Sequence, residues 1–350
     1  MRIAQIAPLA EAVPPRLYGG TERIVSYLTE ELVREGHEVT LFASADSHTR
    51  AKLVPCVPRA LRLDSGVQSQ LPHTLLMLEQ VRRRAHEFDI LHFHIDLLQA
   101  PLFRDIGART LTTLHGRLDL PELAPFYREF HELPFVSISN DQRRPMPPVN
   151  WVGTVYHGLP TDLLRFSPSG GEGYLAFLGR ISPEKRPDRA IEIARLAGLP
   201  LKIAAKVDPA DRVYFEQRIR PMLEDPLIDF IGEIGEARKS EFLGNARALL
   251  FPIDWPEPFG LVMIEAMACG TPVIAFDQGS VPEVLEEGVT GFLVDSVESA
   301  AAAVLRLGEI DRRQVRKRFE ERFSAQRMAC DYLEIYRALA DTSAPRLRAA

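Results

Sequence analysis

Short apolar segments alternate with longer amphipathic segments along most of this chain, and this alternation constrains the fold more than any other feature. The first three segments are RIAQIAP, TERIVSYLTEELVREG and HEVTLFAS. Apolar runs of about four to eight residues have the length of buried strands, whereas apolar residues three and four apart mark one face of a helix. Such alternation builds βαβ units, in which parallel strands form a sheet that helices cover. The sequence therefore predicts an α/β fold.

The alternation occurs twice, on either side of a segment of different texture. A chain of 350 residues is too long for one ordinary core, so two domains are expected. Residues 151–169, WVGTVYHGLPTDLLRFSPS, are rich in glycine, proline and other turn-forming residues, and the alternation restarts behind them with GYLAFLG. We expect an N-terminal domain at 1–155 and a second domain at 160–324.

Four local expectations follow from the same pattern. Thr21 is expected to cap the first helix, and residues 46–72, which lack clear periodicity, to form an irregular excursion. RVYFEQRIRPMLE is expected to be one helix. Residues 311–340 are expected to be helical, and the 341–350 tail to be unordered.

Composition limits the class of protein. Hydrophobic content of 46% and charged content of 26% are typical of a soluble globular protein, and the longest apolar runs fall short of the ~20 residues that span a bilayer. The N-terminus enters a strand at once, which argues against a signal peptide. Three scattered cysteines predict neither a zinc site nor a disulfide framework, and they fit a reducing cytoplasm. A net charge of −6 argues against nucleic acid as a partner.

The stretch 251–276, FPIDWPEPFGLVMIEAMACGTPVIAF, combines a strand end, a Pro-rich loop, a helix and a second strand. Because Gly260 adjoins the start of the helix at 261–269, free backbone N–H groups and the helix dipole suit an anion there. Glu257 precedes this terminus and Glu265 lies inside the helix. An unpaired buried charge is costly, so Glu265 indicates function. The alternative is that Glu265 lies on the solvated face and Glu257 caps the helix.

A second loop, GRISPEKRP at 179–187, follows the first strand of the second domain. Ligands of open α/β sheets bind outside the carboxyl ends of the strands, where this loop is expected. Arg180 and Lys185 could therefore approach one anion from one side while the Gly260 terminus approaches it from the other. A planar guanidinium fork with a mobile ammonium suits a diphosphate. The alternative is a loop with solvated basic residues.

The run EPFGLVMIEAMACGTPVIA resembles the E-x7-E signature of retaining glycosyltransferases of the GT-B fold, family 4, and GRISPEK resembles that family's diphosphate-binding pair. The resemblance covers most of the chain. It implies two facing Rossmann-like domains with parallel sheets and a cleft between them, with the last helix, 325–340, packing back on the first domain. The donor would be held mainly by the second domain and the acceptor by the first.

The resemblance also implies a reaction and roles for individual residues. A hexose would pass from a nucleoside diphosphate sugar, with a UDP-sugar expected first, to a small-molecule, glycan or lipid-linked acceptor, with retention at the anomeric carbon. Arg180 and Lys185 would neutralise the leaving diphosphate, Glu257 would bind the sugar hydroxyls and Glu265 the ribose. The remaining implied donor contacts are Gly19, Gly20 and His115 near phosphate and sugar, the backbone of Phe259, Gly260, Leu261 and Val262, and, for the base, Gly232, Glu233 and Ile234.

A metal ion is not expected. His92, His94 and Asp96 share one strand face, as metal ligands can, but a completing ligand is missing and the chain contains no D-x-D pair. We therefore expect neither a metal nor a cofactor, and the nucleotide sugar serves as a substrate.

Two other functions remain open. The first is a sugar-nucleotide epimerase or hydrolase on the same fold. The second is a binding module without activity, although the carboxylates and the basic pair of an enzyme are all present. Peripheral membrane contact is not excluded, and neither the acceptor nor the oligomeric state follows from the sequence.

Overall fold

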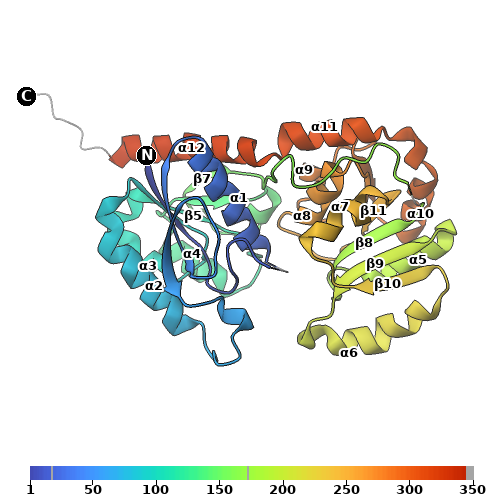
Figure 1. The fold of residues 1–350 in the computed structure, drawn as a ribbon, viewed down its shortest axis with the longest axis horizontal. Helices are drawn as coiled ribbons and strands as arrows, with labels where there is room; N and C mark the ends of the chain where they lie inside the picture. The colour runs from blue at the N-terminus through green and yellow to red at the C-terminus, as the bar shows by residue number, and fades with distance from the viewer. Residues whose placement is uncertain (17–18, 172, 344–350) are drawn as a thin grey trace, which may run out of the picture. The chain divides into compact units, whose positions relative to one another are not determined.

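A computed structural model describes residues 1–16, 19–171 and 173–343. The chain divides into two compact units, one formed by Met1–Gly158 with Ala325–Ala350 and the other by Leu159–Ser324. Each unit is built on a sheet whose paired strands all run parallel (Figure 1). The α/β prediction is therefore confirmed.

The described residues of the first unit form a seven-stranded sheet in the order β3-β2-β1-β4-β5-β6-β7. The strands are β1 (Arg2–Ile6), β2 (Glu38–Ser44), β3 (Lys52–Val57), β4 (Ile90–Phe93), β5 (Thr110–Thr113), β6 (Phe135–Ser137) and β7 (Trp151–Thr154). The helices are α1 (Gly20–Arg34), α2 (Leu71–Arg84), α3 (Gln99–Phe103), α4 (Leu123–Glu129) and α12 (Ala325–Ser343).

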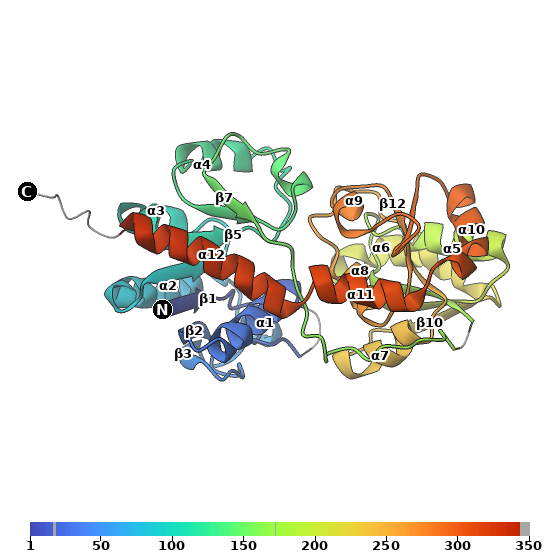
Figure 2. The same cartoon turned by 90° about the horizontal axis from the view of Figure 1, so that it is seen from above.

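Helices cover both faces of this sheet because successive strand residues point to opposite sides. On β2, Phe42 belongs to an apolar cluster with Met77 and Leu78 of α2, whereas its neighbour Leu41 belongs to a cluster with Val25 of α1. The C-terminal helix α12 lies beside α1 and contacts β4 (Figure 2). The last helix of the chain thus belongs to the first unit.

The second unit contains a six-stranded sheet in the order β10-β9-β8-β11-β12-β13. Its strands are β8 (Leu175–Arg180), β9 (Leu201–Lys206), β10 (Ile228–Gly232), β11 (Ala248–Phe251), β12 (Val273–Phe276) and β13 (Gly291–Val294). Its helices are α5 (Pro187–Ala197), α6 (Arg212–Tyr214), α7 (Glu236–Gly244), α8 (Leu261–Ala268), α9 (Val281–Val284), α10 (Val297–Leu305) and α11 (Arg312–Arg322). Helix α5 packs with α10, and α8 packs with α7 and α11.

The structure corrects the expected excursion at 46–72. Lys52–Val57 form the edge strand β3, which pairs parallel with β2. Pro55 lies inside this strand, and proline normally argues against a strand. An edge strand tolerates it because one side of its backbone needs no partner.

Two expected helices are also interrupted. RVYFEQRIRPMLE forms α6, a π-helical turn at Phe215–Ile219 and a 3-10 turn at Arg220–Glu224, since Pro221 lacks the N–H that a regular helix would use. Residues 311–340 are not one helix, because α11 ends before Phe323 and α12 begins after it. Between the two helices, the Phe323 carbonyl accepts from the Leu159 N–H (2.9 Å) and not from an N–H of a continuing helix. The tail expected at 341–350 lies outside the described residues beyond 343; α12 itself extends to Ser343.

Candidate active site

The sheet of the second unit changes winding direction between β8 and β11, which are neighbours in the sheet although the strands β9 and β10 separate them in sequence. In doubly wound folds, ligands bind outside the carboxyl ends of the strands at this switch point. The loop after β8 ends at Arg186, and the loop after β11 runs from Pro252 to Gly260. Both loops carry residues that the sequence singles out.

The two loops meet through an ion pair. The Lys185 ammonium donates to the Glu257 carboxylate, and the indole Nε1–H of Trp255 donates to the same oxygen (2.9 Å). The ammonium also lies 5.3 Å from the centre of the Trp255 ring, within cation–π range. Both charged side chains are largely buried, at 21% and 12% exposure. The predicted diphosphate-binding lysine and sugar-binding carboxylate therefore come together at the switch point.

Helix α8 begins beside this pair in the chain with an uncapped N-terminus. Gly260 adopts φ 81° at the N-cap, where a Cβ would meet Met263 at 2.8 Å, so glycine is required. Among the described residues, no side chain caps this terminus, and the N–H groups of Leu261 and Val262 donate to no backbone carbonyl. These N–H groups remain available for an anion, as the sequence predicts.

The Glu257 backbone rests on a glycine that sequence reasoning missed. A Cβ on Gly279 would lie 2.6 Å from the Glu257 carbonyl oxygen, and the Gly279 φ is 59°. The next N–H, that of Ser280, donates to the same carbonyl (3.0 Å). The backbone of this second turn thus fixes the position of the loop from Pro252 to Gly260 at Glu257. In the sequence, the only sign of this contact is a glycine before a short helix. That sign does not show which loop the glycine contacts.

Glu265 is buried, as the sequence suggests, but it is paired. The Lys239 ammonium of α7 donates to its carboxylate at 2.5 Å, and the lysine is only 12% exposed. The solvated-face alternative for Glu265 is therefore wrong. Lys239 was missed because the pair depends on the packing of α7 against α8, which periodicity does not specify.

Arg180 lies apart from the Lys185 pair. Its guanidinium is 3.8 Å from carboxylate oxygens of Glu184, Asp208 and Asp211, too far for hydrogen bonds, and its Nε has no hydrogen-bond partner among the described residues. Within the part of the chain that the structure describes, no ion pair joins it to Glu257. The Arg180 guanidinium is therefore held loosely by three carboxylates, and among the described residues it shares no anionic partner with Lys185.

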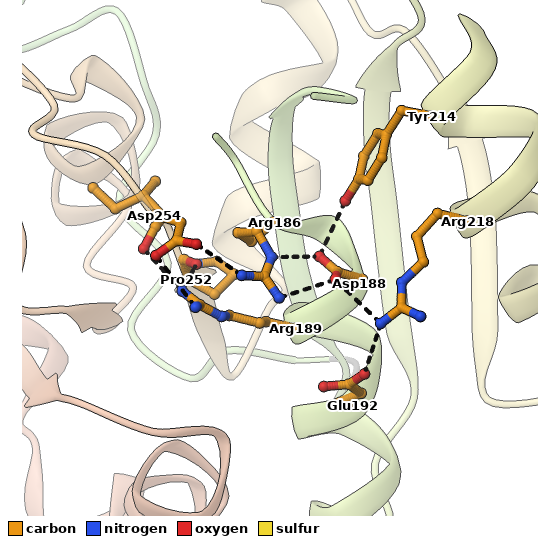
Figure 3. Close-up of polar contacts among 9 residues, drawn as sticks. Arg186, Asp188, Arg189, Glu192, Tyr214, Arg218, Pro252 and Asp254 are labelled. Atoms are coloured by element: carbon orange, nitrogen blue, oxygen red, sulfur yellow. Dashed lines mark hydrogen bonds and ion pairs between the residues drawn. The ribbon is translucent and has the colours of Figure 1, made fainter. Parts of the chain in front are cut away.

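A network of charged side chains holds the two loops together (Figure 3). Arg186, the N-cap of α5 at φ 50°, donates to Asp188 (2.9 and 3.1 Å) and to Asp254 (2.9 Å). Tyr214 donates to Asp188 (3.1 Å), and the Asp254 N–H donates to the Glu184 carbonyl (2.9 Å). Burial alone would raise the pKa of Asp188, but the Arg186 guanidinium and the Tyr214 hydroxyl hold it below its usual range. The network holds the loop after β8, which carries Lys185, against the loop after β11, which carries Glu257.

The other donor contacts expected in the second unit lie near the ends of its strands and helices. Gly232 ends β10 at φ 72°, Glu233 is exposed and Ile234 is buried. Phe259 is buried, and its carbonyl accepts from the Ser280 hydroxyl (2.9 Å). The Phe259 side chain therefore belongs to the core.

In the first unit, the turn before α1 carries the two predicted glycines. The N-cap of α1 is Gly19, where a Cβ would lie 2.8 Å from Pro15, and Gly20 is the first helical residue. The expected cap at Thr21 is wrong, since it lies inside the helix; no described side chain caps this terminus. The neighbouring Tyr18 lies outside the described residues.

His115 follows β5, and burial lowers its pKa to about 3, so its imidazole is neutral at physiological pH. Its Nε2 is 2.9 Å from His94 Nδ1, and its ring stacks with that of His157 at 5.2 Å between centres. His92 also bonds to protein groups, Tyr336 and Thr113. The described residues contain no group of three or more His, Cys, Asp or Glu side chains that could hold a metal ion.

Two family models match consecutive parts of this chain. Glycosyltransferase Family 4 matches residues 18–149, and Glycosyl transferases group 1 matches residues 165–324, which includes both loops of the site. The chain belongs to the group 1, family 4 glycosyltransferases.

Individual relatives agree with this family. A D-inositol 3-phosphate glycosyltransferase from Rhodococcus erythropolis is 28% identical, over 92% of this chain and 87% of its own. Among solved structures, sucrose-phosphate synthase from Thermosynechococcus elongatus has a TM-score of 0.79 at 19% identity, covering 98% and 100% of the two chains. HepE from Anabaena, in complex with UDP and glucose, has a TM-score of 0.69 at 18% identity, covering 97% and 100%. The fold of this glycosyltransferase is GT-B. Over the described residues, no helix is long and apolar enough to cross a membrane.

Proposed function

We propose that this glycosyltransferase moves a hexose from a nucleoside diphosphate sugar to an acceptor with retention at the anomeric carbon. The observation that carries the proposal is the Lys185–Glu257 pair at the β8/β11 switch point, next in the chain to the uncapped terminus of α8. An ammonium and free helix N–H groups suit a diphosphate, and a carboxylate suits sugar hydroxyls. The diphosphate and the sugar of a nucleotide sugar are thus matched by neighbouring groups.

The roles of the residues follow from these chemistries. Charge grows on the leaving diphosphate in the transition state, and Lys185, Arg180 and the α8 terminus offer preorganised positive charge to it. Glu257 accepts hydrogen bonds from sugar hydroxyls. Glu265, held in place by Lys239, accepts from the ribose. Because fixed protein groups meet the charge, the proposal includes neither a metal nor a cofactor.

The family resemblance adds the remaining contacts. It assigns the base to the backbone of Gly232, Glu233 and Ile234, and the donor sugar to His115. Gly19 and Gly20 would leave room for the donor phosphate, since each lies where α1 begins.

UDP is the first nucleotide to test because HepE binds UDP and glucose. The name of the Rhodococcus relative makes inositol phosphates the first acceptors to test. Cytoplasmic localisation stays a prediction from the scattered cysteines. An epimerase or hydrolase would convert the donor without an acceptor, so product analysis with and without inositol phosphate separates the functions.

The decisive experiment measures sugar transfer by a Lys185→Ala variant. Loss of one preorganised donor to the leaving group lowers kcat by roughly 10²–10³, and UDP binding weakens by about 1.5–3 kcal/mol, the value of a charge-assisted bond. Lys317→Ala is the matched control, since Lys317 is 61% exposed on α11 and, among the described residues, pairs only with Glu321 at 3.8 Å. Near-normal turnover by Lys185→Ala would refute the assignment.

A further inference from the structure

A chain of buried polar side chains runs through the first unit from α12 to His115. Its members are Gln5 on β1, His92 on β4 with His94 directly after it, Thr113 on β5, and Tyr332 and Tyr336 on α12. Each of these side chains is at most 2% exposed. Buried polar groups are costly unless they are hydrogen-bonded, so a network of this size in a core needs a reason beyond stability.

The direction of one arm of this network follows from the chemistry of its groups. The Gln5 amide nitrogen donates to the Tyr336 hydroxyl (3.1 Å), which leaves the Gln5 carbonyl oxygen facing His94 Nε2 (2.7 Å). A carbonyl oxygen can only accept, so His94 carries its proton on Nε2. His94 Nδ1 must then accept, and its partner at 2.9 Å is His115 Nε2. His115 is therefore protonated on Nε2.

The imidazoles of His94 and His115 are both neutral. Burial, together with neighbouring histidines, lowers the pKa of His94 well below its ordinary value, and burial lowers that of His115 to about 3. Each ring thus carries one proton. The second nitrogen of His115, Nδ1, has no hydrogen-bond partner in the described part of the chain. It is a lone-pair acceptor that the protein itself leaves unused.

We propose that Gln5 and His94 are positioning residues that hold His115 in the Nε2–H tautomer and so present its Nδ1 as an acceptor to a hydroxyl of the donor sugar. The proposal rests on the proposed function, in which His115 lies against that sugar. The opposite amide orientation of Gln5 would reverse the arm and leave an N–H at Nδ1. The structure has the orientation in which the Gln5 amide nitrogen donates to the Tyr336 hydroxyl and the Gln5 carbonyl oxygen faces His94. Gln5 of β1 thereby sets, through His94, the hydrogen-bonding character of a residue that follows β5.

The tautomer can be measured without any activity. We would label histidine with ¹⁵N and record long-range ¹H–¹⁵N correlations, in which protonated and bare ring nitrogens have distinct shifts. A His115→Asn variant assigns the His115 signals by their loss. The expected result is a protonated Nε2 and a bare Nδ1 for His115 in the wild-type protein. A protonated His115 Nδ1 overturns the proposal, whatever the protein catalyses.

A substitution at Gln5 tests whether this residue sets the tautomers of His94 and His115. Gln5→Met removes the acceptor at similar size, so the His94 and His115 ring shifts move towards values intermediate between the two tautomers. Tyr332→Phe is the matched control, because it removes an equally buried hydroxyl from the Thr113 arm (2.8 Å) and leaves the His94 arm intact. Unchanged shifts in Gln5→Met overturn the positioning role.

Kinetics then separate positioning from folding. Gln5→Met lowers kcat about three- to tenfold, the effect of one neutral hydrogen bond, while the Kd for UDP, measured by calorimetry, changes less than about twofold because UDP carries no sugar to meet His115. Tyr332→Phe keeps the wild-type kcat. A wild-type kcat in Gln5→Met overturns the proposal. Absence of transfer by the wild-type protein instead overturns the proposed function, and the tautomer result distinguishes the two.

Discussion

Replacing Gly279 by alanine adds one methyl group beneath the Glu257 backbone. The new Cβ would lie 2.4 Å from the Glu257 backbone nitrogen and 2.6 Å from its carbonyl oxygen, whereas ordinary contact begins at 3.4 Å, so one loop must move by about 1 Å. A misplacement of about 1 Å can cost 10²-fold in rate, and we therefore expect kcat for sugar transfer to fall roughly 10- to 100-fold. The left-handed φ of 59° costs a further ~1–2 kcal/mol of folding stability for a residue with a Cβ.

Gly288→Ala separates the two effects. Gly288 also has a left-handed φ, of 72°, but a Cβ there meets nothing within 4 Å. Both variants should lose similar stability from backbone strain in urea unfolding, and Gly279→Ala should lose about 1–3 kcal/mol more from overpacking. Only Gly279→Ala should lose transfer activity in a steady-state assay with a UDP-sugar. Equal kcat values for the two variants would refute the reasoning.

Three further predictions concern charge. Glu265→Gln should weaken UDP binding by about 1.5–3 kcal/mol, while Glu257→Gln should spare UDP binding and damage transfer; calorimetry that shows equal losses would contradict this division of roles. Transfer should survive excess EDTA with retained configuration by NMR, and activity that returns only with Mg²⁺ or Mn²⁺ would contradict the metal-free mechanism. Burial lowers the pKa of His92 and His94 below the ordinary 6.5, so as pH falls below 6.5 the unfolded chain takes up protons that the folded unit does not. The contribution of these histidines to the unfolding free energy of the first unit should be fully present above pH 6.5 and should fall by up to about 1.4 kcal/mol per pH unit per histidine below it. Urea unfolding followed by Trp151 fluorescence in a Trp255→Phe background measures this free energy, and a value that does not change with pH would contradict the prediction.

Local pattern determined much of this protein. The alternation of strand and helix segments predicted both parallel sheets, and the glycine at 260 predicted an open helix terminus. These features depend on residues within a turn or two of one another, where periodicity and glycine conformation act directly. The edge strand β3 was not predicted because Pro55 breaks the local pattern. Only pairing with β2 makes this segment a strand.

The site was decided by tertiary structure. Lys185 and Glu257 are 72 residues apart, and Lys239 and Glu265 are 26 apart, so each pair exists only because strand order and helix packing bring its members together. Gly279 is a further example, because the loop that carries Glu257 leaves no room for a Cβ at this position. Sequence spacing carries no such information, because a side chain contacts whatever the sheet order places beside it. The sequence by itself therefore determined which residue types were present at the strand ends, and the order β8-β11 decided which of them meet.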